Sequence, residues 1–444
     1  MDFSVQNNRG LSLRMNMTFS KKQIDCGARR VFLLCVLAYT AIYVGRKNLS
    51  VCLSAMISEG FIDKVTGGAA GTAFLVVYAV GQFISGLISD RVSPSFMITV
   101  GLLGAGAANI SMAFNRFSSI VPVIWCICGI FCSMLWSAVI KCIAQWLPPE
   151  RVERAGVNLS VTVPLGSVIT YLIATLSLRF SGWRTVFLIC GSVCIAAAIV
   201  FIVSANRMTG YIEYISKNCG ESVKTSDIAA SYTNSMGAGL FSLIFSFEML
   251  LIIAAVMCNG VLKDGLDLWT PTFISEYFEV SASFTALLMS LIPLLNVAGA
   301  YLSEFFYSKM HLDEISVTAL MYGIAMLCFL PICIFTAIGV TGAFFRWISI
   351  ILLAFIMMAT TGANTMLMTF IPLRYKRIGK VSSISGMLNA FSYAGASCSG
   401  ISVGLISEYG GWSVTILSFA VISLLGVVIS LVCIRFWRRK MSKF

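Results

Sequence analysis

Charged residues are scarce in this chain, because Asp, Glu, Lys and Arg together make up only 11% of its 444 residues. A soluble domain carries about 25% charged residues. The chain is also 58% hydrophobic, which is more than a soluble core absorbs. Its apolar runs continue for about 20 residues without the alternation of barrel strands. This composition excludes a soluble protein and a β-barrel, and it predicts an all-α polytopic membrane protein.

Histidine is nearly absent too, since His311 is the only one. The 15 cysteines lie mostly within apolar runs, and no Cys-x-x-Cys pair has matching His or Cys partners. Such a pattern does not favour a zinc or haem site, and these cysteines are interpreted as small apolar packing residues. We therefore expect no metal, no cofactor and no enzyme activity.

Positive charge is in excess, with 31 Lys and Arg against 19 Asp and Glu and a net charge of +12. The basic residues fall in short loops and tails between apolar runs, so we expect the lipid bilayer rather than nucleic acid as a partner. Lys and Arg concentrate on the cytoplasmic side of membrane proteins. Their distribution predicts that both termini lie in the cytoplasm, and we expect a multi-pass protein of the plasma (inner) membrane. We further expect a functional monomer.

Twelve spans fit the apolar runs, six on each side of a polar stretch at about 206–238. We interpret this stretch as a flexible cytoplasmic linker between two six-helix bundles. The expected domains are a cytoplasmic tail (1–30), an N-terminal bundle (31–205), a linker with an interfacial segment (206–248), a C-terminal bundle (249–434) and a second cytoplasmic tail (435–444). The expected spans are 31–56, 69–89, 95–114, 120–146, 155–178, 185–205, 249–272, 284–304, 315–338, 343–371, 381–407 and 411–434.

The two halves repeat each other weakly. Gly182-Trp183 opens the sixth span and Gly411-Trp412 opens the twelfth, while Pro148 closes the fourth span and Pro372 closes the tenth. Matches in the same order and at similar separations support a duplicated six-span unit. Two such halves, related by an axis along the membrane normal, are a known transporter plan with the substrate site between them.

Arg46 and Lys47 lie side by side within the first apolar segment. A cation near the bilayer centre costs about 2.5–3.5 kcal/mol on insertion scales. We therefore expect this pair to face a polar cavity and Arg46 to bind an anion, whereas Lys47 either binds it too or pairs with a neighbouring carbonyl or acid. The repeat leads from Arg46 to Lys263 in the seventh span, so each half would offer one cation to a central site.

Other charged residues are interpreted as parts of a gate or anchor. If the seventh span were 240–262, Lys263 would lie at the outer interface, and Asp264 beside it would neutralise its charge. Glu248 is interpreted as a structural pair or gate, with a proton relay as the alternative. Lys141 is interpreted as an anchor at the inner end of the fourth span. The expected conformational latches are Asp90, Arg91 and Glu304.

Several motifs together resemble one family. The most specific is Tyr39-x3-Tyr43-x2-Arg46-Lys47-Asn48, which resembles the first-span phosphate-binding signature of the organophosphate:phosphate antiporter family of the major facilitator superfamily. Its members include bacterial glycerol-3-phosphate and hexose-6-phosphate exchangers. Further matches are Ser89-Asp90-Arg91, Trp136, Lys141, Gly265, Trp269, Pro271, Thr272, Gly386, Tyr393 and Gly395.

The resemblance implies a twelve-helix fold and a binding Arg in each of the first and seventh spans. The first falls on Arg46 and the second on Lys263, so charge is kept there but the planar fork of Arg is lost. One branch of the family has a Lys where this chain has Gln82 and a His near Leu165. The resemblance also adds Tyr393 to the binding residues.

A phosphate dianion entering a membrane cavity needs positive charges and hydrogen-bond donors in place of water. Tyr39 and Tyr43 lie one turn apart and would add hydroxyls beside Arg46. We therefore expect exchange of an organophosphate for inorganic phosphate by alternating access. The alternatives are a proton- or sodium-coupled symporter of a carboxylate or acidic sugar, and a transporter-like organophosphate sensor.

Overall fold

The computed structural model describes residues 20–89, 92–148, 161–219, 246–375 and 381–441, with the single positions 151, 155 and 159. Within these ranges the ordered elements are helices joined by short turns, and no strand occurs. A helix satisfies its backbone hydrogen bonds internally, so it is the structure that a long apolar segment adopts in lipid. The expected all-α polytopic fold is confirmed.

Each half of the chain forms a bundle of long helices. The N-terminal half contains α2 (Lys21–Ser58), α3 (Lys64–Ser89), α4 (Pro94–Phe114), η1 (Ser118–Ile120), α5 (Val121–Trp146), α7 (Thr162–Phe180), α8 (Trp183–Arg207) and α9 (Thr209–Cys219). The C-terminal half contains α12 (Phe247–Tyr277), α13 (Ala282–Met289), α14 (Ile292–Lys309), α15 (Glu314–Ile338), α16 (Ala343–Thr365), η2 (Met366–Phe370), α17 (Ile371–Arg374), α18 (Val381–Tyr409) and α19 (Gly411–Met441).

Within the described ranges, every expected span overlaps helix in this structure. In the described part of the chain, 11 segments are long and apolar enough to cross a membrane. The remaining expected span, 381–407, coincides with α18, which is rich in Gly, Ser and Ala and therefore less apolar. Small residues let helix backbones approach closely, which suits a helix packed between neighbours.

Three predicted bounds differ from the helix bounds of the structure. Residues 21–30 of the expected tail are helical, because Ser20 caps α2 and Gln23 completes the capping box. The expected flexible linker begins with helix α9 instead, and its interfacial segment lies almost wholly outside the described residues. The expected eighth span is divided into α13 and α14, with Pro293 in the first turn of α14.

One contact is repeated in the two halves. Trp183 Nε1 donates to Glu59 Oε2 at 2.9 Å, and Trp412 Nε1 donates to Glu276 Oε2 at 2.9 Å. In both halves the Trp opens the last long helix of the bundle, and the Glu lies at the end of the first. The Gly before each Trp has positive φ, +85° in one half and +73° in the other. This shared geometry supports the internal repeat inferred from the Gly-Trp pairs.

Gly411 is a position where a side chain would be strained without touching a neighbour, because its φ is +73° and nothing lies within 4 Å of the point that a Cβ atom would occupy. We expect Gly411→Ala to destabilise the protein by about 1–2 kcal/mol, seen as a lower melting temperature in detergent. Gly323 in α15 has the same open surroundings without positive φ, so Gly323→Ala is the matched control and should not lower it. Equal melting temperatures for the two variants would contradict this prediction.

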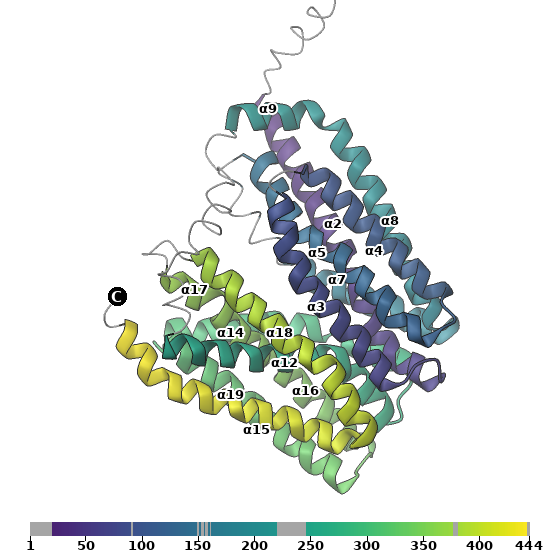
Figure 1. Cartoon of the computed structure of the whole chain (residues 1–444), viewed down its shortest axis with the longest axis vertical. Helices are drawn as coiled ribbons and strands as arrows, with labels where there is room; N and C mark the ends of the chain where they lie inside the picture. Colours follow the sequence, from purple (N-terminus) through teal and green to yellow (C-terminus); the bar gives the residue numbers. More distant parts are fainter. Residues whose placement is uncertain are drawn as a thin grey trace, which may run out of the picture.

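The two halves are joined at one end of the molecule. Lys64 Nζ lies 2.8 Å from Glu276 Oε2, and Thr72 Oγ1 donates to the Ser397 carbonyl at 2.7 Å. A Cβ on Gly68 would lie 2.3 Å from the Gly400 carbonyl oxygen, so α3 and α18 are in backbone contact there. Figure 1 shows the halves meeting near the start of α3 and the end of α18 and diverging toward α9 and α17.

Candidate functional site

Arg46 lies in the middle of α2, half-buried, among aromatic rings from two helices. Its guanidinium carbon is 4.4 Å from the centroid of the Tyr78 ring, 4.9 Å from Tyr43 and 5.2 Å from Phe74. A cation over an aromatic face gains about 0.5–2 kcal/mol, more as water is excluded. These rings hold the guanidinium in one place, and its contact with the Tyr78 hydroxyl leaves further N–H groups that could donate to a ligand.

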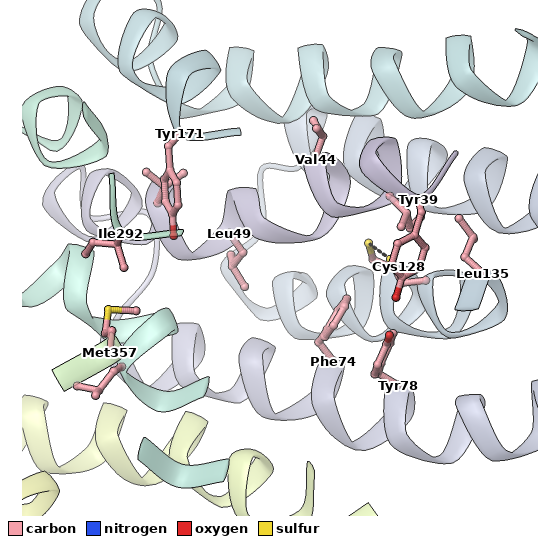
Figure 2. Close-up of a cluster of buried hydrophobic side chains, with 14 of the residues drawn as sticks. Tyr39, Val44, Leu49, Phe74, Tyr78, Cys128, Leu135, Tyr171, Ile292 and Met357 are labelled. Atoms are coloured by element: carbon pink, nitrogen blue, oxygen red, sulfur yellow. Dashed lines mark hydrogen bonds between the residues drawn. The ribbon is translucent and has the colours of Figure 1, made fainter. Parts of the chain in front are cut away.

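The other predicted tyrosines surround this cluster. Tyr39 is buried and packs edge-on against Tyr43, with ring centroids 5.3 Å apart. Tyr393 comes from α18 in the other half and packs edge-on against Tyr78 at 5.4 Å. Figure 2 shows Tyr39, Phe74 and Tyr78 converging on one space between α2 and α3. The structure therefore brings Tyr39, Tyr43 and Tyr393 together around Arg46.

Phe74 and Tyr78 are absent from the residues chosen by sequence. Their signal was two aromatic residues one helical turn apart in the second span, which is also typical of ordinary packing. One turn further, Gln82 Nε2 donates to the Tyr78 hydroxyl at 2.8 Å, and Asn389 Nδ2 of α18 donates to Gln82 Oε1 at 3.5 Å. A polar row thus leads from Arg46 across to the C-terminal half.

Lys47 forms an ion pair with Asp267, so α2 and α12 are joined across the two halves. Ser50 strengthens this joint, because its Oγ donates to the Asp267 carbonyl at 2.5 Å. Of the two interpretations of Lys47, the structure shows the one in which it pairs with an acid. Asp267 was missed by sequence, although an acidic residue within an apolar span is itself an indication of function.

Lys263 lies near the middle of α12, which begins at Phe247. Lys263 is therefore not at a helix end, and residues 240–245 of the alternative seventh span lie outside the described residues. Its Nζ lies 2.8 Å from Asp264 Oδ1, and the side chains are 35% and 19% exposed. The Asp264 carboxylate also lies within electrostatic reach of Lys47 and Arg46. Lys263 thus reaches the same region as Arg46, but a carboxylate accompanies it.

Five charged side chains of α2 and α12 lie at this site, namely Arg46, Lys47, Lys263, Asp264 and Asp267, and they are unequally paired. Lys47 and Lys263 each contact a carboxylate, whereas Arg46 contacts only aromatic rings and the Tyr78 hydroxyl in the described part of the chain. Three cations and two carboxylates leave one net positive charge, centred on Arg46. Arg46 is therefore the side chain most available to bind an anion.

The remaining predicted residues that the structure describes make contacts other than with Arg46. Lys141 Nζ of α5 donates to the Val92 carbonyl at 3.0 Å, a contact that suits an anchor. The Glu248 carbonyl, in the first turn of α12, accepts from Cys433 Sγ of α19 at 3.7 Å. Glu304 is exposed on α14. The other two expected latch residues, Asp90 and Arg91, lie outside the described residues.

The sequence matches the Major Facilitator Superfamily over residues 35–396. It is 22% identical to a "Probable hexose phosphate transport protein" of Chlamydia trachomatis serovar D over 424 residues, which is 91% of each chain. It is 32% identical to a "Putative glycerol-3-phosphate transporter 2" of Arabidopsis thaliana over 173 residues, covering 36% of this chain and 34% of that protein. It is also 26% identical to "Membrane sensor protein UhpC" of Escherichia coli over 175 residues, covering 38% and 39%.

The fold is similar to solved transporters. The nucleoside transporter NupG superposes with a TM-score of 0.71 at 14% identity, over 91% of this chain and 99% of that one. An inward-facing, unoccupied bacterial homologue of the human lysosomal transporter Spinster superposes with a TM-score of 0.69 at 15% identity, over 94% and 98%. The names of the relatives match the organophosphate:phosphate antiporter family that the sequence motifs resemble, and the chain belongs to the Major Facilitator Superfamily as an integral multi-pass transporter.

Proposed function

We propose that this transporter exchanges an organophosphate, of the sugar phosphate or glycerol phosphate type, for inorganic phosphate. The observation that carries the proposal is Arg46, a cation between the halves that lacks a carboxylate partner in the described chain. An Arg guanidinium matches two phosphate oxygens at once. The names of the relatives, which refer to hexose phosphate and glycerol-3-phosphate, point to the same chemistry.

Phosphate would bind at the Arg46 guanidinium with the hydroxyls of Tyr43, Tyr78 and Tyr393 as further donors. A hydrogen bond to a charged group contributes about 1.5–3 kcal/mol, so a few such bonds suit binding followed by release. Lys263 would approach the anion from the other half, moderated by Asp264. The internal repeat alone predicts two equivalent cations, Arg46 and Lys263. Because Asp264 accompanies Lys263, we expect Arg46 to contribute more of the binding free energy than Lys263 does.

Alternating access fits the distribution of contacts between the halves. The ion pair Lys64–Glu276 and the contact of α3 with α18 join the halves at one end, and Lys47–Asp267 joins them beside Arg46, while Figure 1 shows the halves diverging toward α9 and α17. With both termini in the cytoplasm, as the Lys and Arg distribution indicates, this arrangement is an inward-facing state of a monomer in the plasma (inner) membrane. Reaching the outward-facing state would require both ion pairs to separate.

The experiment that tests this function uses purified protein in liposomes loaded with labelled inorganic phosphate. External hexose phosphates, glycerol phosphate and three-carbon phosphoacids are added one at a time. We expect phosphate efflux with at least one of them and none with buffer. If none of the organophosphates causes phosphate efflux, the assignment is overturned. Acid-stimulated uptake into phosphate-free liposomes would favour ion-coupled symport.

A sensor is the second candidate, because the sequence is similar to a protein named as a membrane sensor. Binding of an organophosphate without any flux in the same liposomes would favour the sensor. Phosphate efflux would exclude sensing as the sole function.

A further inference from the structure

The charged side chains at the site determine whether it binds a phosphate compound as a monoanion or as a dianion. Building on the proposed exchange function, we infer that the site selects solutes with one net negative charge, and that Asp264 is the specificity-determining residue that imposes this limit.

The net charge of the site comes from five side chains. Arg46 and Lys47 come from α2, and Lys263, Asp264 and Asp267 come from α12. Each carboxylate lies against a cation, which favours its ionised form. The site therefore carries a charge of plus one, and a monoanion neutralises it whereas a dianion leaves one negative charge unbalanced.

Asp264 lies beside Lys263 at a partly exposed position of the site. Its side chain is 19% exposed, so it borders the space that solvent reaches rather than facing a sealed core. Whereas Asp267 is joined to α2 through Lys47 and Ser50, Asp264 contacts only its sequence neighbour Lys263 among the described cations. The titratable groups that face the Asp264–Lys263 pair are Lys47, Arg46 and Tyr43 of α2, Asp267 of α12 and Tyr393 of α18.

The charge of Asp264 makes binding of a dianion less favourable than binding of a monoanion. A negative charge beside Asp264 is repelled by it, and an unbalanced charge in a partly buried site is unfavourable. Asp264 also offsets Lys263, which removes the second cation that a dianion would need. A neutral loaded site has a further advantage, because it can reorient without moving charge through the membrane potential.

The test compares two esters of one hexose as competitors of labelled phosphate exchange in liposomes. A hexose 6-sulfate keeps a single negative charge, whereas a hexose 6-phosphate passes from one to two negative charges near about pH 6. The measured quantity is the ratio of their half-inhibitory concentrations at one pH, so that effects of pH on the labelled phosphate cancel. For the natural chain we expect the phosphate ester to weaken relative to the sulfate ester by at least about tenfold between about pH 5 and about pH 8.

The variant arm uses Asp264→Asn, with Asp264→Glu as the charge-preserving variant and Glu408→Gln as a control at an exposed position of α18. We expect Asp264→Asn to reverse the preference at about pH 8, so that the phosphate ester competes at least about tenfold better than in the natural chain. Asp264→Glu and Glu408→Gln should retain the natural ratio.

Two results would overturn the inference while leaving the exchange function intact. One is a natural chain in which the phosphate ester gains potency above about pH 6 and the sulfate ester fails to compete. The other is an Asp264→Asn protein with the same ratio as Glu408→Gln. If Asp264→Asn does not fold, the measurements on the natural chain decide alone. Failure of the exchange function itself is distinguishable, because the natural chain would then show no exchange with any organophosphate.

Discussion

Replacing Arg46 by Lys is expected to reduce phosphate exchange by about 10- to 100-fold, although the positive charge is kept. The reason is geometric, because Lys lacks the planar fork that donates to two phosphate oxygens and stacks between the rings of Tyr43 and Tyr78. Loss of one hydrogen bond to a charged group corresponds to about 1.5–3 kcal/mol. The measurement is the initial rate of labelled phosphate efflux from liposomes over a range of organophosphate concentrations.

Lys47→Arg is the matched control for that experiment. Arg at position 47 still offers a cation to Asp267 of α12, so the partly buried pair is kept and exchange should fall less than in Arg46→Lys. A greater loss with Lys47→Arg than with Arg46→Lys would show that Lys47, and not Arg46, is the principal ligand.

The second large effect concerns the ion pair between the halves. Asp267→Asn leaves Lys47 without its partner in a setting where the two side chains are only 26% and 18% exposed. Removing one partner of a buried pair costs about 3–5 kcal/mol, whereas removing both is often tolerated. We therefore expect Asp267→Asn to abolish most exchange, and the double variant Lys47→Gln with Asp267→Asn to recover part of it.

The melting temperature in detergent distinguishes a pair that only stabilises the contact between the halves from a pair that also contacts the substrate. If the pair only stabilises this contact, the double variant should exchange phosphate at a measurable rate with a melting temperature close to that of the natural chain. A double variant that is as inactive as Asp267→Asn while fully folded would show that Lys47 or Asp267 contacts the substrate.

Much of the fold could be predicted from local sequence. Hydrophobic runs of span length indicate helices regardless of what surrounds them, so within the described ranges the expected spans all overlap helix in the structure. The expected bounds differ from the helix bounds where capping or proline, rather than hydrophobicity, determines where a helix begins. Capping by Ser20 lengthens α2 into the polar tail, and Pro293 divides the expected eighth span between α13 and α14.

The site was only half predictable. Arg46 is conspicuous because a cation inside an apolar run is costly wherever the run packs. Phe74 and Tyr78 could not be recognised from the sequence, because two aromatic residues one helical turn apart form the same pattern whether they face lipid, a core or a guanidinium. Asp267 could have been noticed by the same reasoning as Arg46, yet its partner Lys47 is 220 positions away and no local rule connects them.

The amino-acid sequence by itself determined that this chain forms membrane-spanning helices in two similar halves, with a cation inside the first span. Hydrophobic transfer is nearly additive along the chain, so composition and spacing are sufficient for it. Only the tertiary structure decided which of the three cations is available to a ligand. Ion pairing depends on distances of a few ångströms, and those exist once α2 and α12 lie against each other and leave Arg46 among aromatic rings instead of beside a carboxylate.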